Sequence, residues 1–343
     1  MATEWLVEGP LAGPMGRDYW LRRPATIEPG RTYWPVIGVH GYGGKGSDGL
    51  SLTELPDRDG YIGICPSFPN EGYQVLGGGS DEQLINLVAD LRRRFRLQER
   101  MFVIGFSGGA QFAHRFAMNR PDQVVGCSAH SGGTWGPDVL PKALGIPFAI
   151  SCGLNDTEVS RGASANRITE ASTWFAALAA KGGWCNARLW PGVGHSYEAG
   201  AKAQTVACYD LAIAGLHAHE QQALDQAAAN VREALLSGDL GKARTQLSAL
   251  QRLTLPKPIL RPDARARTPV KDLPARQTAL TSAGLGGRDA ENKEHWIDDQ
   301  RETMAGWSDG PIPIQLRQTR FLERRNLLVA ALRKQLREQE KTR

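Results

Sequence analysis

The fold is decided by residues 101–109, which read MFVIGFSGG. The apolar run at 101–104 predicts a buried strand, and residues 111–118 space their apolar side chains as a helix does. Between them lies the pattern Gly-x-Ser-x-Gly, which is typical of a sharp turn that holds its serine in strained backbone geometry. A side chain at position 105 or 109 would strike the neighbouring strand or helix. The stretch therefore predicts a strand, a turn and a helix, with Ser107 as a candidate nucleophile.

A nucleophilic serine needs a base, an orienting acid and an oxyanion hole. The chain offers a candidate for each at the end of a strand-like apolar run. Residues 35–39 lead into the loop HGYGG at 40–44, residues 147–153 are followed by Asp156, and residues 187–190 lead towards His195. Open α/β sheets bind their ligands at the carboxyl ends of the strands, so these parts are expected to meet.

Over about residues 30–217 the chain resembles an α/β-hydrolase of the polyhydroxyalkanoate depolymerase and feruloyl esterase type. The segments that carry the resemblance are HGYGG at 40–44, CPSF at 65–68, GFSGG at 105–109, CGLND at 152–156 and GH at 194–195. The resemblance implies an α/β fold with a mostly parallel central sheet flanked by helices. It also implies hydrolysis of a small or polymeric ester through an acyl-enzyme intermediate, without a cofactor.

The order of parts in such hydrolases assigns the roles: Ser107 is the predicted nucleophile, His195 the base and Asp156 the acid. The backbone N–H groups of Gly108 and Tyr42 are the predicted oxyanion hole.

Three further side chains are candidates for the substrate pocket: His40, Tyr73 and Trp135. In the resembling families the histidine at the position of His40 shapes the oxyanion loop. For Tyr73 and Trp135, ordinary loop packing is an equally good interpretation.

Two of these assignments have alternatives. His130 ends the apolar run at 124–129 and is the second candidate for the base. Asp138 is the second candidate for the acid, because some hydrolases carry the acid after the preceding strand. The loop at 131–144 is too short for a helical cap, which predicts an open cleft suited to short or exposed esters.

Composition limits the class of protein. The chain has 343 residues, of which 41% are hydrophobic, and no apolar run approaches the length of a membrane span. Its first residues lack the pattern of a signal peptide, which favours a cytoplasmic location, although the resembling families are often secreted. The five cysteines lack metal-ligand spacing, so we expect buried free thiols and no metal site.

The last third differs from the rest. Residues 220–343 carry 22 Lys and Arg against 16 Asp and Glu, whereas the remaining chain is close to neutral. We predict a catalytic domain at 1–218, a helical hairpin at 219–253, a Pro-rich linker at 254–289 and a basic helical tail at 290–343.

The tail is expected to contain a short helix around Trp296 and a final helix over about 315–340. Leu322, Val329, Leu332 and Leu336 form the apolar seam of that final helix, and Arg325 interrupts it. Docking on the chain itself is the favoured interpretation, ahead of a homo-oligomer, a protein partner or a membrane surface. No nucleic-acid partner is expected.

The function that these patterns predict is a serine carboxylic-ester hydrolase. A peptidase or amidase on the same fold is the alternative within enzymes. A non-catalytic scaffold whose helical tail recruits a partner is the alternative outside them.

Overall fold

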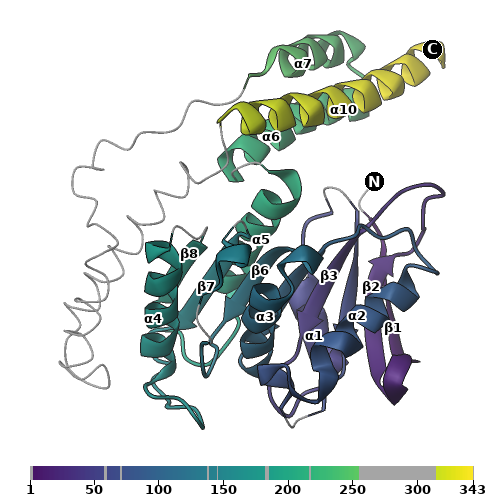
Figure 1. Ribbon diagram of the computed structural model, residues 1–343. Helices are drawn as coiled ribbons and strands as arrows, with labels where there is room; N and C mark the ends of the chain where they lie inside the picture. Colours follow the sequence, from purple (N-terminus) through teal and green to yellow (C-terminus); the bar gives the residue numbers. More distant parts are fainter. Residues whose placement is uncertain are drawn as a thin grey trace, which may run out of the picture. The chain divides into compact units, whose positions relative to one another are not determined.

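The structure is a computed structural model that describes residues 3–57, 60–69, 72–136, 139–144, 146–181, 185–215, 218–254 and 314–342. Eight strands form one sheet (Figure 1). They are β1 (Trp5–Ala12), β2 (Asp18–Pro24), β3 (Trp34–Val39), β4 (Tyr61–Pro66), β5 (Met101–Phe106), β6 (Val124–His130), β7 (Phe148–Gly153) and β8 (Cys185–Trp190).

The order of the strands across the sheet is β1-β2-β4-β3-β5-β6-β7-β8. From β4 to β8 every neighbouring pair is parallel, and β2 and β1 add an antiparallel edge. The predicted fold, an α/β-hydrolase fold with a mostly parallel sheet, is confirmed. Strand β5, which carries the serine motif, lies between β3 and β6, inside the parallel part of the sheet.

Helices flank the sheet (Figure 1). They are α1 (Gly46–Gly49), α2 (Ser80–Leu91), α3 (Gly108–Asn119), α4 (Arg167–Ala180) and α5 (Ala199–Ala214). Between β6 and β7 the described residues contain only a 3-10 turn at Pro141–Ala143. The predicted alternative acid, Asp138, lies outside the described residues.

Both faces of β5 are buried, as in parallel sheets covered on two sides. Successive side chains of a strand point to opposite faces. Met101 and Val103 belong to one apolar core with Phe112 of α3. Phe102 points the other way and contacts Tyr209 of α5, with ring centroids 5.3 Å apart. Helices on the two faces thus hold β5, and with it the position of Ser107.

Four of the five cysteines can be described, and each is buried and free: Cys65, Cys127, Cys152 and Cys208. Burial raises the pKa of the Cys65 thiol to about 12, so this side chain is a neutral packing group near neutral pH. The cytoplasmic location stays a prediction. Among the described residues, none of the helices combines the length and apolar character that a membrane crossing requires.

A second compact unit begins at Asp210. It contains α6 (Ala218–Leu236), α7 (Leu240–Arg252) and α10 (Ile314–Lys341). The turn between α6 and α7 has Gly238 at φ 73°, and the Asp239 side chain accepts a hydrogen bond from the Lys242 N–H at 2.8 Å. The glycine lets the chain leave α6, and the Asp239 N-cap starts α7. Together they form the turn of the predicted hairpin.

Helix α10 packs on the hairpin through Phe321, Val329, Leu332 and Leu336, which join its apolar core. The buried residue at the start of this stripe is Phe321, where we expected Leu322. Arg325, which interrupts the sequence pattern, donates a hydrogen bond from Nη1 to the Leu253 carbonyl at 2.9 Å, just past the end of α7. A basic side chain at this place satisfies a carbonyl at a helix end.

The remaining predictions for the last third concern residues that the structure does not describe. The linker from 255 onward and the short helix around Trp296 both lie outside the described residues. The predicted domain boundaries stay a prediction.

Candidate active site

Ser107 lies at the turn between β5 and α3. Its backbone has φ 55° and ψ −120°, a conformation that non-glycine residues rarely adopt. A Cβ on Gly105 would overlap the Gly109 carbonyl, and a Cβ on Gly109 would overlap the Val39 carbonyl of β3. The two glycines are therefore required by close backbone approach, and the turn presents Ser107 at the carboxyl edge of the sheet.

Three predicted side chains from different loops meet at this edge. The Ser107 Oγ lies 3.0 Å from the His195 Nε2, and the His195 Nδ1 lies 2.7 Å from the Asp156 Oδ2. An ionised carboxylate only accepts hydrogen bonds, so Nδ1 donates and Nε2 is left to accept from the serine hydroxyl. His195 is 34% exposed at its side chain, whereas Asp156 is buried. The arrangement is a serine, a base within reach of it and an acid behind the base.

Arg167, at the start of α4, holds the other oxygen of the acid. Its Nη1 lies 2.9 Å from Asp156 Oδ1 and 2.9 Å from Glu158 Oε2. Burial acts to raise the pKa of the Asp156 carboxyl. The hydrogen bond with His195 and the charge of Arg167 outweigh it, so the pKa lies below its ordinary value. Asp156 is thus an anion whose two oxygens are fixed by two partners.

The loop that carries His195 is held against the loop that carries Asp156. The Asn155 N–H donates to the Val193 carbonyl at 2.8 Å, and the Leu154 N–H donates to the Trp190 carbonyl at 3.0 Å. A Cβ on Gly153 would overlap the carbonyls of residues 193 and 194. These backbone contacts set the distance between the acid and the base.

The residues predicted for the oxyanion hole also lie together. A Cβ on Gly108 would lie 2.9 Å from the Tyr42 backbone nitrogen, so the two N–H groups are close neighbours. As the first residue of α3, Gly108 has no intrahelical acceptor for its N–H. Among the described residues, neither N–H has a hydrogen-bond acceptor. Two adjacent unpaired donors beside Ser107 can stabilise a developing oxyanion.

His40 and Tyr73 are buried behind this loop. The His40 Nε2 accepts a hydrogen bond from the Phe68 N–H at 3.0 Å, and its Nδ1 donates to the Gly41 carbonyl at 2.7 Å. The Tyr73 hydroxyl donates to the His40 carbonyl at 2.9 Å. Burial lowers the pKa of His40, which keeps the ring neutral. The structure does not bring these two side chains to the wall of the cleft; their contacts fix the shape of the loop.

An open cleft of about 1090 Å³ lies over Ser107. Tyr42, which is 68% exposed, stands on its wall, as does Trp135, whose Nε1 donates to the Gly132 carbonyl at 3.2 Å. The wall also carries several charged side chains from α3 and from the segment 158–170. The cleft is consequently more polar than a pocket for a long alkyl chain.

His130, the alternative base, lies in a closed polar cluster. Its Nδ1 lies 2.6 Å from the Ser151 Oγ, and its Nε2 lies 2.8 Å from the Ser128 Oγ and 2.9 Å from the Thr205 Oγ1. Its side chain is buried, and burial lowers its pKa to about 3. Only its backbone reaches the serine: the His130 carbonyl accepts from the Ser107 N–H at 2.9 Å.

Two arginines of the cleft were not found by sequence reasoning. Arg167 follows Asp156 by eleven residues, and Arg115 follows Ser107 by eight. Neither spacing belongs to a recognised motif. For Arg115 a weak signal existed, since it falls on the same helical face as Gly108 and Gln111.

No protein-family model matches this chain, and no curated protein matches it. Solved structures with a similar arrangement include a thermostable esterase, with 17% identity and a TM-score of 0.45 over 55% of this chain and 54% of that one. They also include poly(aspartic acid) hydrolase-1 from Sphingomonas sp. KT-1, with 17% identity and a TM-score of 0.45 over 62% and 97%. A ferulic acid esterase from Anaeromyces mucronatus has 15% identity and a TM-score of 0.45 over 62% and 90%.

This chain thus spans about half the length of the thermostable esterase. The assignment of the fold rests on the sheet and its strand order.

Proposed function

We propose that this protein is a serine carboxylic-ester hydrolase in which Ser107, His195 and Asp156 act as a catalytic triad. The observation that carries the proposal is the pair of contacts at His195: 3.0 Å from Nε2 to the Ser107 Oγ and 2.7 Å from Nδ1 to the Asp156 Oδ2. A hydroxyl, a base that can take its proton and an acid that fixes the base are the parts needed for acyl transfer.

In the first step, the Ser107 Oγ attacks the ester carbonyl while His195 Nε2 takes the hydroxyl proton. The carbonyl oxygen becomes an oxyanion that accepts hydrogen bonds from the N–H groups of Gly108 and Tyr42. Asp156 stabilises the imidazolium through Nδ1. His195 then gives its proton to the leaving alcohol, and an acyl-enzyme remains on Ser107.

In the second step, His195 takes a proton from a water molecule that attacks the acyl carbonyl. Collapse of the second tetrahedral intermediate releases the carboxylic acid, and His195 returns the proton to Ser107. The partly exposed position of His195 supports this step, because water reaches the ring from the cleft. The donors of the oxyanion hole serve both steps.

The substitution Ser107→Ala tests the proposal. With p-nitrophenyl butyrate we expect a loss of turnover of about 10⁴-fold or more, together with loss of labelling by a fluorophosphonate probe. The fold should persist, because alanine needs no more room than serine.

Ser131→Ala is a matched control. Ser131 follows β6 as Ser107 follows β5, and it also has a positive φ, 52°. Its hydroxyl is buried and has no contact with His195. Turnover close to wild type is expected in this variant. Full activity of the Ser107→Ala protein would reject the triad, and turnover of aminoacyl anilides ahead of esters would reject the ester class.

A further inference from the structure

One wall of the cleft is formed by a single face of α3 that starts at the nucleophile. Gly108, Gln111 and Arg115 are spaced by three and four residues and all line the cleft. Side chains of a helix point back towards its N-terminus. Accordingly the Arg115 Nη1 donates to the Gln111 carbonyl at 3.0 Å, on the Ser107 side of its own Cα.

Arg115 is a buried cation. Only 8% of the residue is exposed, and its Nη1 also donates to the Gln74 carbonyl at 3.2 Å, while its Nη2 donates to the Thr134 Oγ1 at 3.0 Å. All of these acceptors are neutral. Burial lowers the pKa of Arg115 to about 10, so the side chain is still charged at neutral pH. A charge that is buried without a counterion is costly, which calls for an explanation.

Among the described residues, no carboxylate oxygen lies within 4.0 Å of the Arg115 guanidinium. Glu170 acts on it only at longer range, and its Oε1 already accepts hydrogen bonds from the N–H and hydroxyl of Ser164 and from the Ala165 N–H. The other acid that lines the cleft, Glu158, is paired with Arg167. The negative charges near Arg115 are thus engaged elsewhere.

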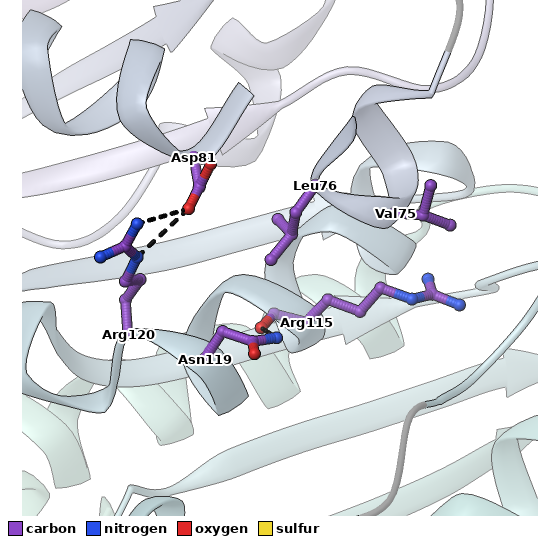
Figure 2. A pocket seen from close by; sticks show the side chains of 6 residues that line it. All are labelled: Val75, Leu76, Asp81, Arg115, Asn119 and Arg120. Carbon is purple, nitrogen blue, oxygen red and sulfur yellow. Dashed lines mark hydrogen bonds and ion pairs between the residues drawn. The ribbon is translucent and has the colours of Figure 1, made fainter. Parts of the chain in front are cut away.

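The next arginine, just past the end of α3, shows the contrast. Arg120 turns to the opposite side and forms an ion pair with Asp81 at 2.8 Å (Figure 2). Figure 2 shows Arg115 running past Leu76 with its guanidinium directed towards Val75, away from that pair. The two arginines lie on one small pocket, but only Arg115 also reaches the cleft over Ser107.

The guanidinium keeps donors for a ligand. Three of its five N–H hydrogens are used by Gln74, Gln111 and Thr134. The Nε–H and the second Nη2 hydrogen have no acceptor among the described residues. These contacts also lock the plane of the group, so it is preorganised for an anion.

We propose that Arg115 forms a subsite for a carboxylate on the acyl part of the substrate, so that the enzyme prefers half-esters of short dicarboxylic acids. This inference rests on the proposed function. The carboxylate accepts hydrogen bonds from Arg115 and supplies the missing counterion. The exposed Arg161, which also lines the cleft, adds positive charge.

The length of the acyl chain follows from the helix. Gln111, whose carbonyl accepts from Arg115, lies four positions after Ser107, which corresponds to a rise of about 6 Å along a helix. We take this rise as the order of the gap between a carboxylate at Arg115 and the carbonyl that Ser107 attacks. An adipyl group spans such a gap, so the mono-p-nitrophenyl ester of adipic acid is a suitable probe.

The experiment compares this half-ester with its neutral carboxamide, the p-nitrophenyl ester of adipamic acid. The wild-type enzyme should have a kcat/KM for the carboxylate roughly 10- to 100-fold above that for the carboxamide, as expected for a charge-assisted hydrogen bond. In Arg115→Gln the preference should disappear while the carboxamide is still hydrolysed. Arg115→Lys should keep part of the preference, because it keeps the charge without the fork.

Arg120→Gln is the matched control, and it should keep the full preference. Equal rates for the two esters in the wild type would overturn the inference, as would a parallel loss of both rates in Arg115→Gln. Labelling of Ser107 by the fluorophosphonate probe tests the proposed function separately. If Ser107 is not labelled and neither ester is hydrolysed, the triad proposal itself has failed, and not only the subsite.

Inhibition of the wild type gives a second measurement should the Arg115 variants not fold. Free adipate should compete with p-nitrophenyl butyrate, and adipamide should not. Equal inhibition by the two compounds, or none by either, would overturn the inference.

Discussion

His195 and His130 occupy similar places and have opposite surroundings. His130 is the last residue of β6 and His195 lies five residues after the end of β8, so both stand at the carboxyl edge of the same parallel sheet. The ring of His195 is partly exposed and lies between a carboxylate and a hydroxyl. The ring of His130 is buried beside the Tyr197 ring, and its hydrogen-bond partners among the described residues are the hydroxyls of Ser128, Ser151 and Thr205.

The difference lies in what surrounds the charged form of each ring. As the proposed general base, His195 becomes an imidazolium during catalysis, and the carboxylate of Asp156 lies 2.7 Å from its Nδ1, where it can stabilise that charge. Beside His130 the described part of the chain supplies no charge that compensates the loss of water, so burial lowers its pKa to about 3. In the proposed mechanism the ring of His195 takes up a proton, whereas burial keeps the ring of His130 neutral.

Substitution of each histidine by glutamine tests this difference with the largest expected effect. His195→Gln should reduce turnover of p-nitrophenyl butyrate by about 10⁴–10⁶-fold with little effect on stability. His130→Gln should leave turnover near wild type and lower the free energy of unfolding by about 1–3 kcal/mol, because buried hydroxyls lose a partner. Ester kinetics and urea unfolding measure the two effects. An inactive but stable His130→Gln enzyme would reverse the assignment.

Asp156→Asn tests the proposed role of the Asp156 carboxylate. An amide can offer its N–H to the ring and favour the wrong tautomer, so we expect a loss in turnover of roughly 10³–10⁴-fold. Arg167→Gln leaves the carboxylate in place and removes only its second partner, so its loss should be much smaller. Turnover at saturating ester, with melting temperature as a check on folding, measures both. A greater loss in Arg167→Gln than in Asp156→Asn would show that the arginine, and not the carboxylate, is the main support of His195.

The pH dependence of stability gives the smallest effect. The pKa of His130 is about 3 in the folded chain against an ordinary 6.5, so between these values the unfolded chain binds a proton that the folded chain does not. Stability should therefore fall as the pH drops below about 6.5, by up to ~1.4 kcal/mol per pH unit for this group. His114, whose pKa is also lowered to about 3 by burial, acts in the same direction.

Urea unfolding at pH 6.5, 5.5 and 4.5 measures this slope. In the His130→Gln protein the slope of the unfolding free energy against pH should be smaller by the contribution of one titrating group. The same decrease is expected in His114→Gln. A slope unchanged in both variants would show that neither ring is held neutral by the fold.

Much of the parallel sheet could be predicted, because buried parallel strands leave continuous apolar runs such as 101–104 and 147–153. Strands β1 and β2 were not located from the sequence. In β1 Leu6 and Val7 are exposed, and the strand is held mainly by pairing with β2 along the sheet edge. Pairing of this kind leaves no apolar period in the sequence. In α10 the helical period alone favoured Leu322 for the apolar seam. Packing on α6 and α7 instead buries Phe321.

The sequence by itself identified the nucleophile turn, because the pattern Gly-x-Ser-x-Gly follows a strand-like apolar run. The order of Ser107, Asp156 and His195 along the chain already named the candidates. The tertiary structure decided which histidine meets the serine, that Arg167 holds Asp156, and that the buried Arg115 has no ion-pair partner among the described residues. A turn pattern is carried by residues that are neighbours in the chain, whereas burial, charge pairing and the close approach of Val39 to Gly109 depend on groups brought together from distant segments. Arg115 shows this most clearly: an ordinary helical arginine in the sequence, it becomes a candidate for substrate recognition only when its surroundings are known.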